Sequence, residues 1–286
     1  MNPMKPLNLQ FLNKTRRAIL NTGQLVVGGP IVIFKFPSDP NNPASRKDFF
    51  REIDVLCWPR EGTVRVLAYD KAAKWPWYAM EYFPGGSLTQ HAGRLTDQQL
   101  LWITSQLVQK LAIFHRTGGA FGDFKPDNIL LSREGIPTLA DPLGNGSFGL
   151  IGLLFPQQQG GTPGYIAPEV KAGNPISNKG DIYSLAATLF HLATGQVPQD
   201  GLNLDPTAHG FACPAVIREI ILGCSQKDPA VRATVKEAHR ILNGATWADI
   251  LKSREQVQEQ IQGWVAVALA VAVSALAVSA FTTTKA

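Results

Sequence analysis

The chain has 286 residues, of which 45% are apolar, and it carries a formal net charge of +5. This length allows one large domain or two lobes, and the apolar content is ample for a hydrophobic core. The basic residues form no long run, so they do not predict a nucleic-acid partner. The cysteines Cys57, Cys213 and Cys224 contain no C-x-x-C pair, which argues against a zinc site and fits buried thiols in a reducing compartment.

The N-terminal part of the sequence predicts a small β-rich unit. Residues 1–14 contain Pro and Asn and lack the hydrophobic segment of a signal peptide, so we expect a loose lead-in there. Short β-like runs follow, separated by turn-like breaks at residues 21–24 and 28–30. The runs cover residues 18–20, 25–27 and 31–36. They predict a three-stranded meander, and two further strands are expected at residues 64–67 and 77–82.

Two helices are predicted by start signals that precede apolar stripes. Pro43 and Ser45 favour the start of the first helix. Its apolar stripe contains Phe49, Ile53 and Leu56. Glu52 shares that face, and a carboxylate on an apolar stripe needs a partner. Thr96 and Gln99 form a capping-box pattern at the start of the second helix. Its stripe contains Leu100, Ile103, Leu107, Leu111 and Phe114.

Residues 121–131, with the sequence FGDFKPDNILL, set Asp123, Lys125 and Asn128 at fixed offsets. The apolar run at the end of this segment, a turn-like stretch and a second short run before Asp141 predict a β-hairpin. Antiparallel pairing would bring Asn128 and Asp141 together at its open end. Their oxygen atoms suit a hard divalent cation such as Mg²⁺. With Lys125 as a cation for phosphate and Asp123 as a base, this set suits phosphoryl transfer.

These residues carry a resemblance to a known family. FGDFKPDNILL resembles the catalytic loop of eukaryotic-type (Hanks-type) serine/threonine protein kinases, whose common form is H-R-D-x-K-P-x-N-I-L-L. Four further segments resemble, in order, the family's metal-binding segment, the end of its activation loop, its buried helix and its last common stretch. They are ADPLG (140–144), GTPGYIAPE (161–169), DIYSLAATLFHLATGQVP (181–198) and KDPAVRATVKEA (227–238). The resemblance implies a bilobal α+β fold, with a β-rich N-lobe at residues 15–83 and a helical C-lobe at residues 84–243.

The resemblance also implies a site that uses ATP and Mg²⁺, with Mn²⁺ as an alternative metal. Asp123 would orient the substrate hydroxyl and accept its proton, and Lys125 would steady the γ-phosphate. Asn128 and Asp141 would hold the metal. Thr162 would bridge Asp123 and Lys125 and shape the site for a serine or threonine hydroxyl.

On the nucleotide side, Lys35 matches the lysine that contacts the α- and β-phosphates, with Glu52 as its partner. A solvent-exposed lysine at the end of a strand is the alternative interpretation from the sequence alone. The family's G-x-G-x-x-G loop is absent, and Gly23 is the only glycine in the first predicted turn, so fewer backbone amides would reach the phosphates. The adenine pocket would be formed by Met80 at its back and by Glu81 and the backbone of Phe83 at the purine edge.

Three residues are expected to support the site without touching ATP. Glu169 resembles the glutamate that pairs with a distant arginine, here Arg232, and Asp181 resembles the carboxylate that holds the backbone of the catalytic loop. Phe121 and Gly122 replace the family's His and Arg in that loop. The arginine that grips a phosphorylated activation-loop residue is therefore missing, and control through that contact is not expected.

Beyond the kinase-like part, residues 244–263 predict a helix and a polar linker. Residues 264–281, WVAVALAVAVSALAVSAF, are uncharged and mostly apolar. At ~1.5 Å per residue this segment is just long enough to cross a hydrocarbon core. It predicts a single-pass C-terminal anchor that leaves residues 282–286 as a short tail; a buried helix and a disordered tail are the alternatives. Ala270 and Ser274, small and four residues apart, would allow pairing into a homodimer.

The sequence thus predicts an ATP- and Mg²⁺-dependent protein serine/threonine kinase, held at a membrane with its catalytic part in the cytoplasm, where ATP is available. One alternative is a membrane-anchored pseudokinase or scaffold that binds nucleotide weakly, because the glycine loop is degenerate. Another is a small-molecule phosphotransferase of related fold, although GTPGYIAPE resembles a peptide-docking element and favours protein substrates.

Overall fold

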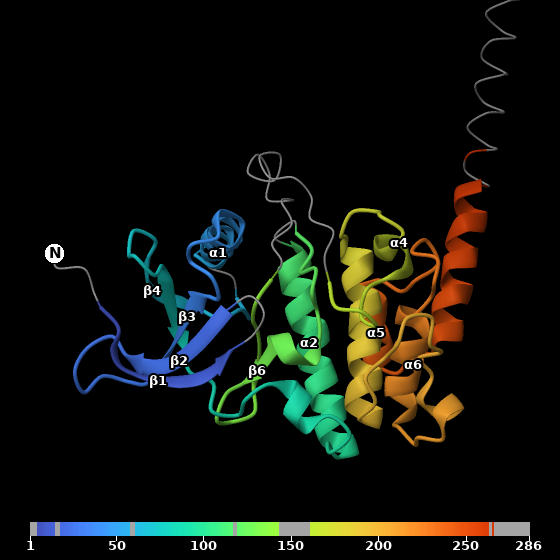
Figure 1. Cartoon of the computed structure of the whole chain (residues 1–286). Coiled ribbons are helices and arrows are strands. Elements are labelled where there is room, and N and C mark those ends of the chain that lie inside the picture. The colour runs from blue at the N-terminus through green and yellow to red at the C-terminus, as the bar shows by residue number, and fades with distance from the viewer. Residues whose placement is uncertain are drawn as a thin grey trace, which may run out of the picture.

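The computed structural model describes residues 5–14, 18–57, 61–116, 119–142, 161–262 and 265. Figure 1 shows an N-terminal sheet with one helix beside a larger, mostly helical part. The sheet is antiparallel, in the order β1-β2-β3-β5-β4. Its elements are β1 (Leu7–Lys14), β2 (Ala18–Gln24), β3 (Val32–Pro37), α1 (Pro43–Leu56), β4 (Val66–Asp70) and β5 (Trp77–Glu81). The predicted bilobal α+β architecture, with a β-sheet N-lobe and a helical C-lobe, is confirmed.

The C-lobe contains one short hairpin among its helices. Its elements are η1 (Leu88–His91), α2 (Asp97–Arg116), η2 (Pro126–Asn128), β6 (Ile129–Leu131), β7 (Pro137–Leu139), α4 (Pro168–Lys171), α5 (Asn178–Thr194), η3 (Pro206–His209), α6 (Ala215–Cys224) and α7 (Val235–Leu242). A further helix covers residues 247–262 and lies at the edge of the C-lobe farthest from the sheet (Figure 1).

The first strands of the sheet differ from the predicted meander. The loose lead-in expected over residues 1–14 is wrong from Leu7 onward, because Leu7–Lys14 forms β1 and pairs with β2. The predicted turn at residues 21–24 is also wrong, because these residues complete β2. The strand expected at residues 25–27 is instead part of a turn that Gly29 N–H closes onto the Val26 carbonyl oxygen at 3.0 Å.

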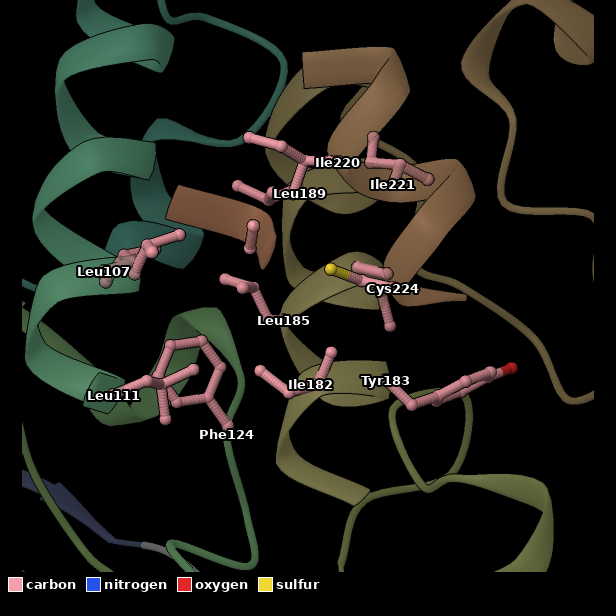
Figure 2. Close-up of a cluster of buried hydrophobic side chains, with 14 of the residues drawn as sticks. Leu107, Leu111, Phe124, Ile182, Tyr183, Leu185, Leu189, Ile220, Ile221 and Cys224 are labelled. Carbon is pink, nitrogen blue, oxygen red and sulfur yellow. The ribbon is translucent and has the colours of Figure 1, made fainter. Parts of the chain in front are cut away.

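Helix α5 forms the centre of the C-lobe and is buried on almost every side. Ser177 caps its start by accepting from Gly180 N–H at 3.1 Å, and Gly195 ends it in the left-handed region at φ 72°. Figure 2 shows how α5 fills the space between α2 and α6. The side chains labelled there include Leu107 and Leu111 of α2, Ile182, Leu185 and Leu189 of α5, and Ile220, Ile221 and Cys224 of α6. This rigid centre supports the segments that carry the site.

The helix starts follow local capping chemistry. Asn42 caps α1 by accepting from Ala44 N–H at 2.9 Å and from Ser45 N–H at 3.3 Å, with Pro43 in the first turn. At the start of α2, Gln99 Oε1 accepts from Thr96 N–H at 2.9 Å and Thr96 Oγ1 accepts from Gln99 N–H at 3.3 Å. The predicted capping box is therefore present.

Among the helices that the structure describes, none combines the length and apolar composition needed to cross a membrane. The span predicted over residues 264–281 lies outside the described residues, except for Val265.

Candidate functional site

Lys35 lies at the meeting point of the sheet, α1 and the segment that follows β7. Strand β3 carries it inward, so that its side chain is only 8% exposed. Its ammonium donates to Glu52 Oε1 at 2.6 Å and to both Asp141 carboxylate oxygens at 2.8 Å. The solvent-exposed alternative for Lys35 is therefore wrong, and the predicted partner Glu52 is in place on α1.

The pKa values of Lys35, Asp141 and Glu52 depend on one another. Burial acts against the Lys35 ammonium, but Asp141 and Glu52 outweigh it and raise the Lys35 pKa. Burial likewise acts against the Asp141 carboxylate, and Lys35 outweighs it, so the Asp141 pKa is lowered. For Glu52, burial dominates over the attraction of Lys35 and the pKa is raised. The lysine and Asp141 are thus held in their charged forms.

Tyr78 completes the cluster, and sequence reasoning missed it. It faces Lys35 in the register of β3 and β5, and it is fully buried. Its hydroxyl donates to Glu52 Oε1 at 2.6 Å, and its ring stacks on Phe49 with centroids 5.6 Å apart. Burial, followed by the nearby Glu52 charge, raises the Tyr78 pKa, which keeps the hydroxyl as a donor.

Asp123, Lys125 and Thr162 meet in one hydrogen-bonded triangle. The Lys125 ammonium donates to Asp123 Oδ2 at 2.7 Å and to the Thr162 hydroxyl. Thr162 Oγ1 donates to Asp123 Oδ1 at 2.8 Å. Asp123 and Thr162, 39 positions apart, are thereby brought together, which is the contact that the family resemblance implies. Within this triangle the Asp123 carboxylate is oriented by the Thr162 hydroxyl and by the Lys125 ammonium, which is also the cation beside it.

The hairpin places Asn128 and Asp141 at its open end. Ala140 N–H donates to the Asn128 carbonyl oxygen at 2.8 Å, which continues the β6 and β7 pairing to the residue before Asp141. The Asn128 side-chain amide donates to the Asp123 backbone oxygen at 2.8 Å and to Asp123 Oδ2 at 3.0 Å. Asn128 is therefore fixed from the catalytic-loop side.

The donor set fits Mg²⁺. Asp141 is anionic and its side chain is 42% exposed, and Asn128 adds an amide oxygen. Mg²⁺ is commonly bound by one or two protein oxygens while it keeps waters and phosphate oxygens, so a larger cage is not required. No group of three or more His, Cys, Asp or Glu side chains suited to a metal occurs among the described residues. The Asp141 backbone has φ 53°, in the left-handed region that residues other than glycine rarely adopt. The two hydrogen bonds between its carboxylate and Lys35 stabilise this conformation.

Asp181, at the start of α5, holds the backbone of the catalytic loop. Its carboxylate accepts from Phe121 N–H at 2.6 Å and from Gly122 N–H at 2.8 Å. His115 Nε2 lies 2.8 Å from Asp181 Oδ2, which gives that histidine a structural position at the end of α2. The Phe121 side chain is fully buried between Phe114 and Phe124.

Glu169 and Arg232 form a bidentate pair deep in the C-lobe. The guanidinium donates to the two Glu169 carboxylate oxygens at 2.6 and 2.8 Å, and Arg232 has no exposed surface. Its remaining donors reach the backbone oxygens of Lys179, Gln226 and Lys227 at 2.7–3.1 Å. Each nitrogen of this buried guanidinium has a hydrogen-bond acceptor. The pair can therefore hold the segment that ends at Glu169 against the α6–α7 connection.

Of the residues predicted near the adenine, Met80 and Phe83 belong to an apolar cluster, whereas Glu81 forms an ion pair. Met80 is buried in the same apolar cluster as Ala140, with Phe83 and Leu130 packed against it, so this cluster joins the sheet to the hairpin. The Glu81 carboxylate pairs with Arg65 instead of lying free.

Gly23 is not in a nucleotide-binding turn, contrary to the prediction. It lies inside β2 opposite Val32, and an added Cβ would come within 2.8 Å of the Leu7 carbonyl oxygen. Residues 15–17, between β1 and β2, lie outside the described residues. Gly23 is therefore explained by close packing of β1 against β2.

Comparison with known proteins agrees with this geometry. The family model described as "Protein kinase domain" matches residues 28–243. One relative is the probable serine/threonine-protein kinase PkwA of Thermomonospora curvata, which is 30% identical to this chain over 231 residues. The aligned region covers 73% of this chain and 30% of that protein. This chain is 29% identical over 179 residues, 56% of its length, to the serine/threonine-protein kinase ppk11 of Schizosaccharomyces pombe, of which this covers 55%.

A third relative is the serine/threonine-protein kinase AfsK of Streptomyces griseus, which is 29% identical over 184 residues, or 58% of this chain and 22% of that protein. The chain thus spans between 22% and 55% of the length of these relatives. The matched family model covers strands β3, β4 and β5, with Lys35 on β3, and the helical part with Asp123. The chain belongs to the protein kinase domain family.

Proposed function

We propose that this protein is a protein serine/threonine kinase that transfers the γ-phosphate of ATP to hydroxyl groups of proteins. The observation that carries the proposal is the triangle of Asp123, Lys125 and Thr162. It sets a carboxylate, a cation and a hydroxyl around one point, on a loop that Asp181 fixes from behind. The three relatives described above are themselves named serine/threonine-protein kinases.

In this proposal each residue has a positional task. Asp123 accepts a hydrogen bond from the substrate hydroxyl, orients it and takes its proton. Lys125 lies beside that carboxylate and neutralises charge on the transferred group. Lys35, set by Glu52 and Tyr78, holds the α- and β-phosphates. Bound Mg²⁺–ATP supplies the phosphoryl group, and Asn128 with Asp141 would hold the metal.

The arrangement favours an active enzyme over a scaffold. A protein that had lost transfer chemistry would have no requirement for Lys35 to be paired with Glu52 while Asp123 is oriented by Thr162 and Lys125. Both arrangements occur together here. The Glu169–Arg232 pair, which fixes the end of GTPGYIAPE, supports a peptide-docking segment and hence protein substrates over small molecules.

An acceptor panel tests the proposal. The full chain is incubated with labelled ATP and Mg²⁺ and with separate acceptors: peptides containing Ser or Thr, peptides containing only Tyr, and an aminoglycoside. Lys35→Met serves as the inactive control, and Lys252→Ala, an exposed cation outside the site, as the matched active control. Label is expected on Ser and Thr peptides only. Label on the aminoglycoside alone would replace the proposal with a small-molecule phosphotransferase.

We also propose that residues 264–281 anchor the chain in a membrane, with the kinase part in the cytoplasm. This rests on the sequence of that segment, 18 uncharged and mostly apolar residues, whose small residues would also allow homodimers. Alkaline washing of membranes tests it. The full chain should stay with the membranes and a variant that ends at Gln262 should not. Release of the full chain by alkali would contradict the anchor.

A further inference from the structure

The helix at residues 247–262 lies beyond the kinase family match, which ends at residue 243, yet its first half packs on the C-lobe. Trp247 is 8% exposed, and its ring lies 2.7 Å from the position that a Cβ at Gly223 would occupy, so only glycine fits under it. Trp247 N–H donates to Glu219 Oε2 at 2.8 Å. The helix predicted at the start of residues 244–263 is therefore present, it continues to residue 262, and its first half is docked on the C-lobe.

Arg254 is the polar centre of this contact. Its guanidinium donates to the two Glu237 carboxylate oxygens at 2.8 and 2.6 Å. It also donates to the backbone oxygens of Val231 at 2.6 Å and Arg232 at 3.1 Å, and it lies over the Trp247 ring at 5.3 Å. One side chain thus binds α7 and the backbone of the α6–α7 connection at once.

That connection is the segment that carries Arg232. The Arg232 side chain holds Glu169. The Lys179 ammonium donates to the same Arg232 backbone oxygen that Arg254 contacts. A continuous chain of hydrogen bonds therefore leads from the C-terminal helix to the end of GTPGYIAPE. Glu237 is held firmly in it: burial opposes its charge, but hydrogen bonds from Arg254 and Thr234 lower the Glu237 pKa to about 2.

We infer that Arg254 is a positioning residue that acts through Arg232 on Glu169, so that residues 247–262 are part of the working kinase unit and not a passive linker. The activity side of this inference rests on the proposed kinase function. Its consequence is that the orientation of the C-terminal helix, and of whatever follows it, influences the segment that docks the substrate.

Hydrogen exchange in the full chain, kept in mild detergent, tests the coupling without requiring activity. Arg254→Ala is compared with Lys252→Ala, which removes an exposed cation from the same helix. Arg254→Ala should speed exchange at residues 226–240 and also at residues 165–174 around Glu169, and Lys252→Ala should change neither. Faster exchange confined to residues 226–262 would overturn the inference, because Arg254 would then stabilise only its own surroundings.

Kinetics supply the second measurement. Arg254→Ala should raise the KM for a protein substrate roughly threefold to tenfold and leave the KM for ATP unchanged. This effect should be lost in a Glu169→Gln background, where the coupling partner is already removed. An equal effect in both backgrounds would overturn the inference. If Arg254→Ala does not fold, Arg254→Lys, which keeps a cation near Glu237 but loses the guanidinium fork, is judged by the same exchange at residues 165–174.

Discussion

Replacing Tyr78 by Phe tests the cluster around Lys35 with the smallest possible change. The ring stays, so its stacking on Phe49 at 5.6 Å is kept, and only the hydroxyl that donates to Glu52 at 2.6 Å is lost. A hydrogen bond to a charged group contributes about 1.5–3 kcal/mol. We expect the free energy of unfolding to fall by about that amount.

The same change should weaken nucleotide binding. Glu52 loses one of the donors that hold it against Lys35, and a loss of ~1.4 kcal/mol corresponds to a factor of ten in affinity. The KM for ATP should therefore rise by up to about tenfold. Because the hydroxyl stabilises the charged form of Glu52, its removal also raises the Glu52 pKa and moves the acid limb of activity to higher pH.

Chemical denaturation and steady-state kinetics measure both effects, and Tyr69→Phe is the matched control. Tyr69 is paired with Tyr78 in the register of β4 and β5, but Tyr69 is 53% exposed, so its change should cost less than ~0.5 kcal/mol. The reasoning is refuted if Tyr78→Phe and Tyr69→Phe have the same stability and the same KM for ATP.

Two further predictions follow from the fold. Gly23→Ala should destabilise the protein by about 1–3 kcal/mol, because its Cβ would clash with the Leu7 carbonyl oxygen and the Phe34 ring; an altered KM for ATP at unchanged stability would restore the nucleotide role. Glu237 has a pKa lowered from 4.5 to about 2, so its pairing with Arg254 stabilises the fold above pH ~4.5 and is lost as the pH falls towards 2. The melting temperature of Glu237→Gln should fall less between pH ~4.5 and pH ~2 than that of the unmodified chain. An equal fall in the two proteins would contradict this.

The catalytic segment could be predicted because its determinants are local. Asp123, Lys125 and Asn128 lie within six residues, and the hairpin that brings Asn128 to Asp141 needs only a turn between two apolar runs. The capping box at the start of α2 is equally local. Where a few neighbouring residues determine the geometry, the sequence pattern was sufficient.

The first strand was missed although residues 7–11, LNLQF, alternate between apolar and polar side chains. This alternation does not correspond to a buried face, because β1 is exposed on both faces. Phe11, for example, is 71% exposed. Because this strand was missed, the first turn of the sheet was predicted at residues 21–24, and Gly23 was placed in that turn instead of inside β2. Tyr78 and Arg254 were missed for another reason: each finds its partner only after α1 or the C-terminal helix has docked, and spacing along the chain does not reveal such contacts.

Transfer of phosphate by the full chain and by its Asp123→Ala variant tests the central claim most directly. Both proteins are given Mg²⁺, labelled ATP and a Ser/Thr substrate, and nucleotide binding is measured in parallel by the shift in melting temperature. We predict that both bind nucleotide, that the unmodified chain transfers phosphate, and that the variant loses at least about a hundredfold of that rate. Equal transfer by both proteins, or binding without transfer by the unmodified chain, would contradict the account.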